Sequence, residues 1–240
     1  MKEKLYTIPV NEAYEADCEC PLCYIKQTLE EKAIDFTMGP SYMEDDVREV
    51  TDEIGFCSHH ISKLYNNQNR LGLALMLKSH MDKTKKHIEN LNSKNTNSSS
   101  VFRKKKEQAP VVSYIKNLEN SCFICDKINN TFERYIATIF TLYKSDSNFR
   151  EKFSHIKGYC TNHYGLLYDK SKNYLRGQVE ESFIKDLNTI YLENFMRVRD
   201  DLDWFIDKFD YRFKDAPWKN SKDALIRTLI KTNGTFVDNV

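Results

Sequence analysis

Six of the seven cysteines in the chain fall into a pattern that occurs twice. The first copy has Cys20-Pro-Leu-Cys23 followed by Cys57-Ser-His-His60, and the second has Cys122-Phe-Ile-Cys125 followed by Cys160-Thr-Asn-His163. The stretch between the paired motifs is 33 residues in the first copy and 34 in the second. Three thiols and one imidazole form a donor set that suits a tetrahedral zinc ion. The sequence therefore predicts two structural zinc sites, one within each copy.

Each predicted site takes all four ligands from its own copy. The first site has Cys20, Cys23, Cys57 and His60, and the second has Cys122, Cys125, Cys160 and His163. His59 is an alternative to His60, but the CxxH spacing of the second copy favours His60. Cys18 has Asn120 as its counterpart, so we expect it to be a bystander. An iron–sulfur cluster is the alternative to zinc, although such clusters usually show other spacings.

The residues between the paired motifs have helical character. With 7 glycines and 5 prolines in 240 residues, the composition favours helices over turn-rich β structure. Apolar residues recur at helical spacing from Tyr24 to Met38, and Gly39-Pro40 ends that segment. Ser41 and Glu44 form a capping box, which predicts a second helix running to about Ile54.

The two helices of each copy are expected to form an antiparallel hairpin. Arms of about 14 residues extend roughly 21 Å and return by the same distance. Cys57 and His60 would then lie beside Cys20 and Cys23, and the zinc would close the open end of the hairpin. Thiolates near helix N-termini are also favoured by the helix dipole.

The copies match beyond the ligands, which indicates an internal duplication. Gly55-Phe56-Cys57 corresponds to Gly158-Tyr159-Cys160. The predicted division is a first repeat over residues 1–91, a flexible polar linker over 92–110 and a second repeat with a helical extension over 111–240. Residues 1–17 are expected to be a polar lead-in, a break is expected at Asn66–Asn69, and the extension contains a long helix from about Tyr174 to Phe213. The predicted fold is all-α, with duplicated zinc-stapled helical hairpins packed with this long C-terminal helix.

Charge and hydropathy limit the class of partner. The net charge is +1 and the mean hydropathy is −0.63, without a long apolar run, so we expect no membrane span and no general attraction to nucleic acid. The basic run Arg103–Lys106 is expected to be part of a solvated linker. The N-terminus lacks an apolar signal segment, so we expect a cytoplasmic, reducing location, where clustered cysteines bind metal more often than they form disulfides.

The sequence matches one enzyme motif in part and lacks several others. Zinc deaminases need an H-x-E upstream of P-C-x-x-C; His87-Ile88-Glu89 supplies the first part, but Ser121 precedes Cys122 in place of proline. The sequence contains no P-loop, G-x-G-x-x-G or G-x-S-x-G motif.

The duplicated motifs and the C-terminal segment carry a resemblance to a known group of proteins. The segment runs from Asp203-Trp204-Phe205 through Asp210-Tyr211-Arg212 to Pro217-Trp218 and Ser221-Lys222-Asp223-Ala224-Leu225. Together these features resemble an uncharacterised bacterial family, a domain of unknown function whose members are sometimes labelled transporter substrate-binding proteins. The resemblance covers most of the chain apart from residues 92–110, and it implies the fold without implying an activity.

Three functions follow as hypotheses. The first is a non-enzymatic zinc-binding helical protein that acts as a scaffold or interaction module for another protein, with the region of Trp204 and Trp218 as contact surface. The second is a thiol-based redox or metal-responsive switch, because thiolate ligands can be oxidised and release their metal. The third is an enzyme with a site in the helical core, which no motif locates.

Overall fold

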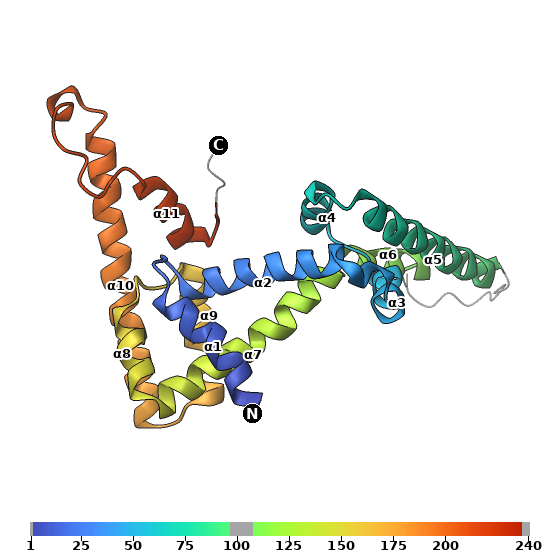
Figure 1. Ribbon diagram of the computed structural model, residues 1–240, viewed down its shortest axis with the longest axis horizontal. Helices are drawn as coiled ribbons and strands as arrows, with labels where there is room; N and C mark the ends of the chain where they lie inside the picture. The colour runs from blue at the N-terminus through green and yellow to red at the C-terminus, as the bar shows by residue number, and fades with distance from the viewer. Residues whose placement is uncertain (1, 97–107, 237–240) are drawn as a thin grey trace. The chain divides into compact units, whose positions relative to one another are not determined.

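The computed structural model describes residues 2–96 and 108–236 (Figure 1). Over these residues the regular secondary structure consists of eleven α-helices and two short 3-10 helices, without a strand. The all-α prediction is therefore confirmed. Among the described residues, no helix combines the length and the apolar character needed to cross a membrane.

The order of the helices repeats along the chain. The first copy contains α1 (Lys2–Glu15), α2 (Pro21–Met38), the 3-10 helix η1 (Pro40–Met43), α3 (Asp45–Ile54), α4 (Ser58–Asn66) and α5 (Arg70–Thr96). The second contains α6 (Pro110–Glu119), α7 (Phe123–Ser145), α8 (Ser147–His155), α9 (Thr161–Tyr174) and α10 (Gln178–Asp207). The 3-10 helix η2 (Tyr211–Phe213) and α11 (Ala224–Asn233) follow. The duplication thus extends over five helices, and α11 has no counterpart in the first copy.

The N-terminal segment is a packed helix, so the predicted polar lead-in over residues 1–17 is wrong. Val10 and Ala13 of α1 are fully buried, and the hydroxyl of the buried Tyr14 lies 2.9 Å from that of Tyr159. Pro9 lies inside α1, where it lacks the N–H that an internal helical residue donates. Because of this proline and the polar outer side chains, the sequence does not indicate a helix here.

The predicted break between the two middle helices is confirmed, because α4 ends at Asn66 and α5 begins at Arg70. The predicted linker is shorter than expected at its start, since α5 extends through Thr96. Residues 97–107 of that linker, which include the basic run Arg103–Lys106, lie outside the described residues.

The chain forms two compact units that do not follow the order of the copies. Unit 1 comprises Met1–Thr28 and Phe132–Val240, and unit 2 comprises Leu29–Thr131. Both boundaries fall inside long helices, so α2 and α7 each contribute residues to both units. The predicted division at residues 91 and 111 separates the two copies along the sequence. Each compact unit, in contrast, contains residues from both copies.

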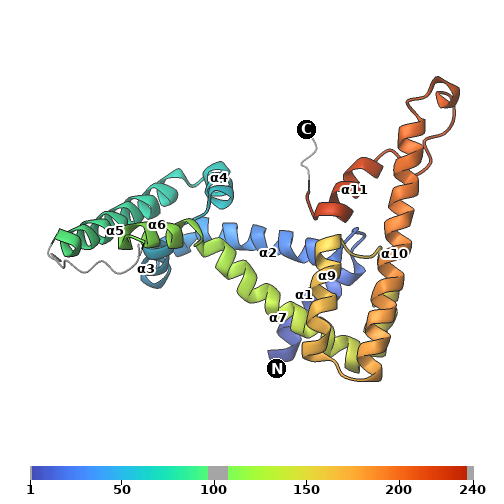
Figure 2. The same ribbon diagram turned by 180° about the vertical axis from the view of Figure 1, so that it is seen from behind.

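Unit 1 has an aromatic core. The ring of Phe183 from α10 lies 5.1 Å from Phe140 and 4.9 Å from Tyr143, both on α7, and 5.4 Å from Phe153 on α8. Such tilted and edge-to-face pairs add to the stabilisation that burial provides. The last helix, α11, packs beside α9 and α10, as both ribbon views show (Figure 2).

The long helix ends earlier than predicted, at Asp207 rather than Phe213. Lys208 explains the end, because its nearly buried ammonium donates to the carbonyls of Phe213, Lys214 and Ala216 at 2.6–2.8 Å. These bonds fold the following residues back into a closed loop. The C-terminal segment that carries the family resemblance therefore forms this closed loop.

Unit 2 is built on the packing of α3 against α5. Val47 and Thr51 of α3 are buried, as are Leu73 and Met76 of α5. The guanidinium of Arg48 donates across the same contact to the carbonyl of Leu75 at 3.1 Å. This contact positions the turn before Cys57 within unit 2.

Candidate metal centres

The eight predicted ligands gather into two clusters, but the pairing crosses the two copies. Cluster A consists of Cys20, Cys23, Cys160 and His163, all in unit 1, and cluster B of Cys57, His60, Cys122 and Cys125, all in unit 2. In each cluster the CxxC of one copy meets the CxxH of the other. The prediction that each copy closes its own site is therefore wrong.

Unequal helix lengths are the physical reason for the crossed pairing. Helix α2 has 18 residues, so it extends for roughly 27 Å, whereas α3 has 10 residues and returns by roughly 15 Å. In the second copy α7 has 23 residues and α8 only 9. The expected capping box is also absent from α3, which begins at Asp45 after the separate 3-10 turn η1. A short return arm cannot bring Cys57 back to Cys20.

Local structure places every thiol near the start of a helix. Cys57 and Cys160 are the N-cap residues of α4 and α9, and each is preceded by a glycine two residues earlier. Gly55 and Gly158 have φ of 62° and 87°, a region that favours glycine. The CxxC motifs likewise coincide with the beginnings of α2 and α7. The partial positive charge at these helix ends favours thiolates.

Cluster A is fully enclosed by unit 1. Its three cysteines are at most 3% exposed, and His163 is 6% exposed. The Nδ1 atom of His163 lies 3.5 Å from the sulfur of Cys20 and 3.3 Å from those of Cys23 and Cys160. The sulfurs of Cys23 and Cys160 are 3.6 Å apart. The ring of His163 also packs against Phe132 at a centroid distance of 5.7 Å.

Cluster B has the same arrangement with greater solvent access. The Nδ1 atom of His60 lies 3.3 Å from the sulfurs of Cys57, Cys122 and Cys125. Cys122 and His60 are buried, whereas Cys57 and Cys125 are half-buried. The sulfurs of these two half-buried residues are 3.9 Å apart.

The donor atoms of each cluster lie close enough together to bind one shared ion. In a tetrahedral site, zinc–sulfur bonds of about 2.3 Å and zinc–nitrogen bonds of about 2.0 Å imply sulfur–sulfur edges of roughly 3.8 Å and sulfur–nitrogen edges of roughly 3.5 Å. In the structure the sulfurs of Cys23 and Cys160 are 3.6 Å apart and those of Cys57 and Cys125 are 3.9 Å apart, and the sulfur–nitrogen separations are 3.3–3.5 Å. Both clusters could therefore hold a metal ion.

The thiols within each cluster differ in acidity according to their place in the fold. Burial raises the pKa of Cys20 and of Cys125 to about 12, and the thiols of Cys160 and Cys122, respectively, add to the shift. The pKa of Cys160 is lowered instead, because Cys20 and Cys23 donate to its sulfur. Burial opposes ionisation of Cys57, but the backbone N–H of His60 and the neighbouring thiols lower its pKa below the usual value. The negative charge is thus favoured on the cysteine that caps a helix.

A carboxylate supports the imidazole of cluster B. Nε2 of His60 donates to Glu30 at 3.1 Å, and the same carboxylate lies 2.7 Å from Nε2 of His59 and 2.5 Å from the ammonium of Lys63. Although partial burial opposes ionisation, the hydrogen bonds from Lys63 and His59 hold the pKa of Glu30 below its usual range. A carboxylate on the second nitrogen of a metal-binding histidine fixes its tautomer and orientation.

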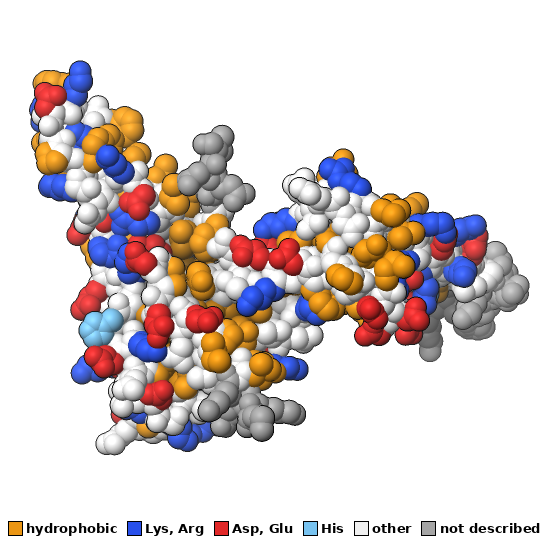
Figure 3. Space-filling model, viewed as in Figure 1, with side chains coloured by type: hydrophobic (Ala, Val, Ile, Leu, Met, Phe, Trp, Pro, Cys, Tyr) orange, Lys and Arg blue, Asp and Glu red, His pale blue; other side chains and the backbone are white. Residues whose placement is uncertain are grey.

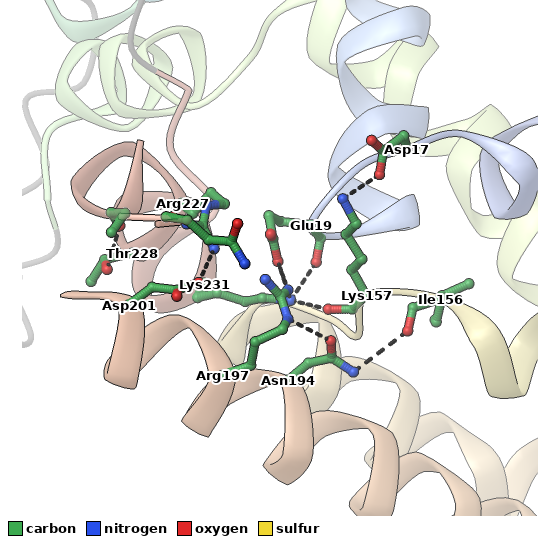
Figure 4. A network of polar contacts seen from close by, with 12 residues as sticks. Asp17, Glu19, Ile156, Lys157, Asn194, Arg197, Asp201, Arg227, Thr228 and Lys231 are labelled. Carbon is green, nitrogen blue, oxygen red and sulfur yellow. Dashed lines mark hydrogen bonds and ion pairs between the residues drawn. The ribbon is translucent and has the colours of Figure 1, made fainter. Parts of the chain in front are cut away.

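A buried ionic network adjoins cluster A (Figure 4). The side chains of Glu19 and Lys231 are only 6% and 2% exposed, and they pair at 3.0 Å. Arg197 also donates to the Glu19 carboxylate, at 2.6 Å, and to the amide oxygen of Asn194 at 3.1 Å. Burial lowers the pKa of Lys231, while Glu19 opposes that shift through its charge and its hydrogen bond. The second carboxylate oxygen of Glu19, Oε1, is buried without a hydrogen-bond partner among the described residues.

The remaining candidates lie outside clusters A and B. The sulfur of Cys18 lies 3.9 Å from the carbonyl of Ala13, and it belongs to neither cluster. His60, and not His59, faces the thiols of cluster B. His87 instead pairs with Glu53 at 3.2 Å.

Sequence reasoning missed Glu30, Glu19 and Lys231. Glu30 lies about two turns beyond Cys23 on α2, next to the exposed Glu31, and the sequence does not show which of the two carboxylates approaches a histidine. Lys231 lies in a helix without a counterpart in the first copy, so the comparison of the copies gave no signal. Only Glu19 offered a clue, because it directly precedes the CxxC motif.

Comparison with known proteins gives one match. The model of a family described as "Family of unknown function (DUF6062)" matches residues 1–239. No curated protein matches the chain. No solved structure matches it either.

Proposed function

The chain belongs to this family of unknown function, DUF6062, and we propose that it is a non-enzymatic zinc-binding helical protein that acts as a scaffold. One observation carries the proposal: each cluster brings together four donors, three sulfurs and one imidazole nitrogen, within 4.8 Å of one another. Four protein ligands leave no coordination position for substrate or water, which is typical of structural zinc sites.

The donor set and its size favour zinc over the alternative of an iron–sulfur cluster. All four donor atoms of each cluster lie within 4.8 Å of one another. A cluster of several irons spreads its ligands farther apart than a single ion does, because each iron binds its own ligands. A single ion with Cys₃His coordination is a common structural zinc site.

Each zinc would act as a long-range cross-link. The ion in cluster A would join Cys23 to Cys160, 137 residues apart, and that in cluster B would join Cys57 to Cys125, 68 residues apart. Loop-closure entropy grows only slowly, by about 0.6 kcal/mol for each doubling of loop length. Both cross-links should therefore restrict the unfolded chain to a similar extent.

The scaffold would present its partner surface at the end of α10. Trp204 is tied to the loop by a hydrogen bond from its indole to the carbonyl of Pro217 at 3.0 Å. Beside it, Ile206, Phe209 and Tyr211 are 59%, 76% and 87% exposed. Figure 3 shows hydrophobic side chains among charged ones in this part of unit 1. We place the contact with a partner protein on these three side chains.

Cluster B also supports the second candidate, a redox or metal-responsive switch. Its half-buried Cys57 and Cys125 lie 3.9 Å apart, whereas every cysteine of cluster A is enclosed. Peroxide could oxidise this pair of thiolates to a disulfide, with reduction of the peroxide to water, and the zinc would lose two ligands. In this alternative, mild peroxide should release one zinc per chain from cluster B before cluster A reacts.

An enzyme receives less support from the described residues. A groove between α9 and α10 is lined by Tyr168, Asp169, Ser171 and Lys172, among others. The Ser171 hydroxyl donates to the carbonyl of Tyr168 at 2.9 Å, and Asp169 pairs with Lys172 at 2.7 Å. The Ser171 hydroxyl is therefore not paired with a side chain that could act as its base, as a catalytic nucleophile would be.

Metal analysis followed by cobalt spectroscopy tests the proposal. The purified chain should contain about two zinc ions, and Cys18→Ser should retain both. Cobalt in the two sites should give intense visible absorption that added azide or cyanate leaves unchanged. Absence of metal, or iron with sulfide, would contradict the zinc assignment. A spectrum that shifts with the anion would reveal an exchangeable ligand and contradict a purely structural role.

A further inference from the structure

The two clusters differ in how the turns that carry their ligands are joined. In cluster B the joint is direct. The hydroxyl of Ser121, next to Cys122, donates to the carbonyl of Ile54 at 2.7 Å, and the N–H of Phe123 donates to the carbonyl of Gly55 at 3.0 Å. Two hydrogen bonds thus hold the CxxC turn against the turn that leads to Cys57.

The corresponding residues around cluster A cannot form these bonds. Glu19 stands at the position of Ser121, and Pro21, which has no N–H, stands at the position of Phe123. The carbonyls that would accept the bonds are those of Lys157 and Gly158. Both direct hydrogen bonds between the two turns are therefore absent from cluster A.

Lys231 fills the gap that these differences leave. Its ammonium donates to the carbonyl of Glu19 at 2.6 Å and to the carbonyl of Lys157, and it pairs with the Glu19 carboxylate at 3.0 Å. Figure 4 shows the lysine reaching from α11 between the two turns. All three N–H donors of the ammonium therefore have acceptors on the turns that carry Cys20 and Cys160.

The end of the same helix covers the thiols of cluster A. Gly234 caps α11 with φ of 66°, and a Cβ atom added there would lie 3.4 Å from the sulfurs of both Cys23 and Cys160. A tetrahedral zinc with three thiolates carries one net negative charge, which the buried ammonium of Lys231 offsets. Helix α11 thus connects the two turns through Lys231, supplies the compensating positive charge and covers the thiols through its C-terminal end.

We propose that Lys231 is an outer-sphere positioning residue of cluster A, which couples metal binding there to the docking of α11. Cluster B, whose turns are joined directly, does not depend on α11. The inference rests on the proposed function, because it requires a metal in cluster A. It adds that the two sites are not equivalent and that the C-terminal helix responds to only one of them.

Metal affinity measured separately at each site tests the role of Lys231. In the full-length chain, Cys57→Ser leaves only cluster A competent and Cys23→Ser leaves only cluster B. In the first background Lys231→Met should weaken zinc binding by about 10- to 100-fold, the usual effect of removing an outer-shell partner. In the second background it should have no effect. Lys222→Met, at an exposed lysine just before α11, is the matched control and should be neutral in both.

The results separate the inference from the proposed function. If the unmodified chain holds no metal, both fail. If it holds two zinc ions and Lys231→Met leaves cluster A unchanged, or weakens both sites equally, the inference alone is wrong, because the lysine then contributes only to general stability.

Hydrogen exchange provides a second test that does not depend on the folding of the Lys231 variant. Backbone amides of α11 should exchange faster in Cys23→Ser, which lacks the metal of cluster A, than in the unmodified chain. In Cys57→Ser they should exchange as in the unmodified chain. Equal protection of α11 in both serine variants would overturn the coupling.

Discussion

Glu30 accepts a hydrogen bond from Nε2 of His60 at 3.1 Å, on the side of the ring opposite the nitrogen that faces three thiols. The carboxylate therefore orients the imidazole toward cluster B. In cluster A the ring of His163 is held by packing against Phe132. The two clusters have the same residue types, with different support for the histidine.

The first prediction concerns this support. Glu30→Ala should weaken zinc binding at cluster B by about 10- to 100-fold, because His60 loses the acceptor that fixes its tautomer. Glu31→Ala, at the exposed neighbouring residue, is the control and should leave zinc binding unchanged. Competition with a chromogenic chelator measures both variants. Equal affinities for the two would show that the carboxylate does not act on the site.

The second prediction tests the crossed pairing through metal content. Cys23→Ser combined with Cys160→Ser should remove one zinc, because both residues belong to cluster A. Cys23→Ser combined with Cys57→Ser should remove both, because the residues belong to different clusters. Elemental analysis distinguishes the pairings, since ligand sets confined to each copy would give the reverse result.

The third prediction concerns the glycine before Cys160. Gly158→Ala should lower the melting temperature, because φ is 87° and the added Cβ would lie 3.0 Å from that of Asn194. The expected loss is about 1–3 kcal/mol. Gly165→Ala, inside α9 with no atom near the added Cβ, should stabilise the chain by up to about 1 kcal/mol. A Gly158→Ala variant as stable as the unmodified chain would show that this turn tolerates a side chain.

The fourth prediction is a pH dependence that arises in the aromatic core. The hydroxyl of Tyr143 donates to Asp186 at 2.6 Å, and burial together with this bond raises the pKa of Tyr143 to about 12. The unfolded chain loses the same proton near pH 10. Between about pH 10 and 12 the folded state binds more protons than the unfolded state, so this contribution to stability falls as the pH rises.

Tyr143→Phe removes both the hydrogen bond and the titration. The variant should be less stable by about 1 kcal/mol at neutral pH, and it should lose less stability than the unmodified chain between about pH 10 and 12. Tyr168→Phe, at an exposed tyrosine, should follow the unmodified chain. Denaturant unfolding across this range gives the comparison, and parallel curves for Tyr143→Phe would exclude the contribution.

The sequence was sufficient to predict which cysteines and histidines take part in the two clusters because the motifs that carry them are local. Each CxxC and CxxH forms within one helical turn, and the glycines before Cys57 and Cys160 mark the turns that precede them. The all-α class followed from apolar spacing and from the low glycine and proline content. These features depend on near neighbours in the chain, which a single sequence displays.

The pairing of the motifs could not be predicted because it depends on distances across the fold. Nearly equal gaps in the two copies made pairing within a copy and pairing between copies equally compatible with the sequence. The difference lies in where α3 begins, since the 3-10 turn over Pro40–Met43 shortens the return arm. Lys231 was missed for a related reason, because its acceptors are backbone carbonyls far from it in sequence.

The crossed pairing has a consequence for the ancestry of the chain. A polypeptide with a single copy would carry one CxxC and one CxxH that do not meet. It could complete a four-donor site only with a second molecule, and the pair would then form two identical sites related by a two-fold axis. The chain of 240 residues corresponds to such a dimer joined into one polypeptide, in which neither half can be lost without dismantling both sites.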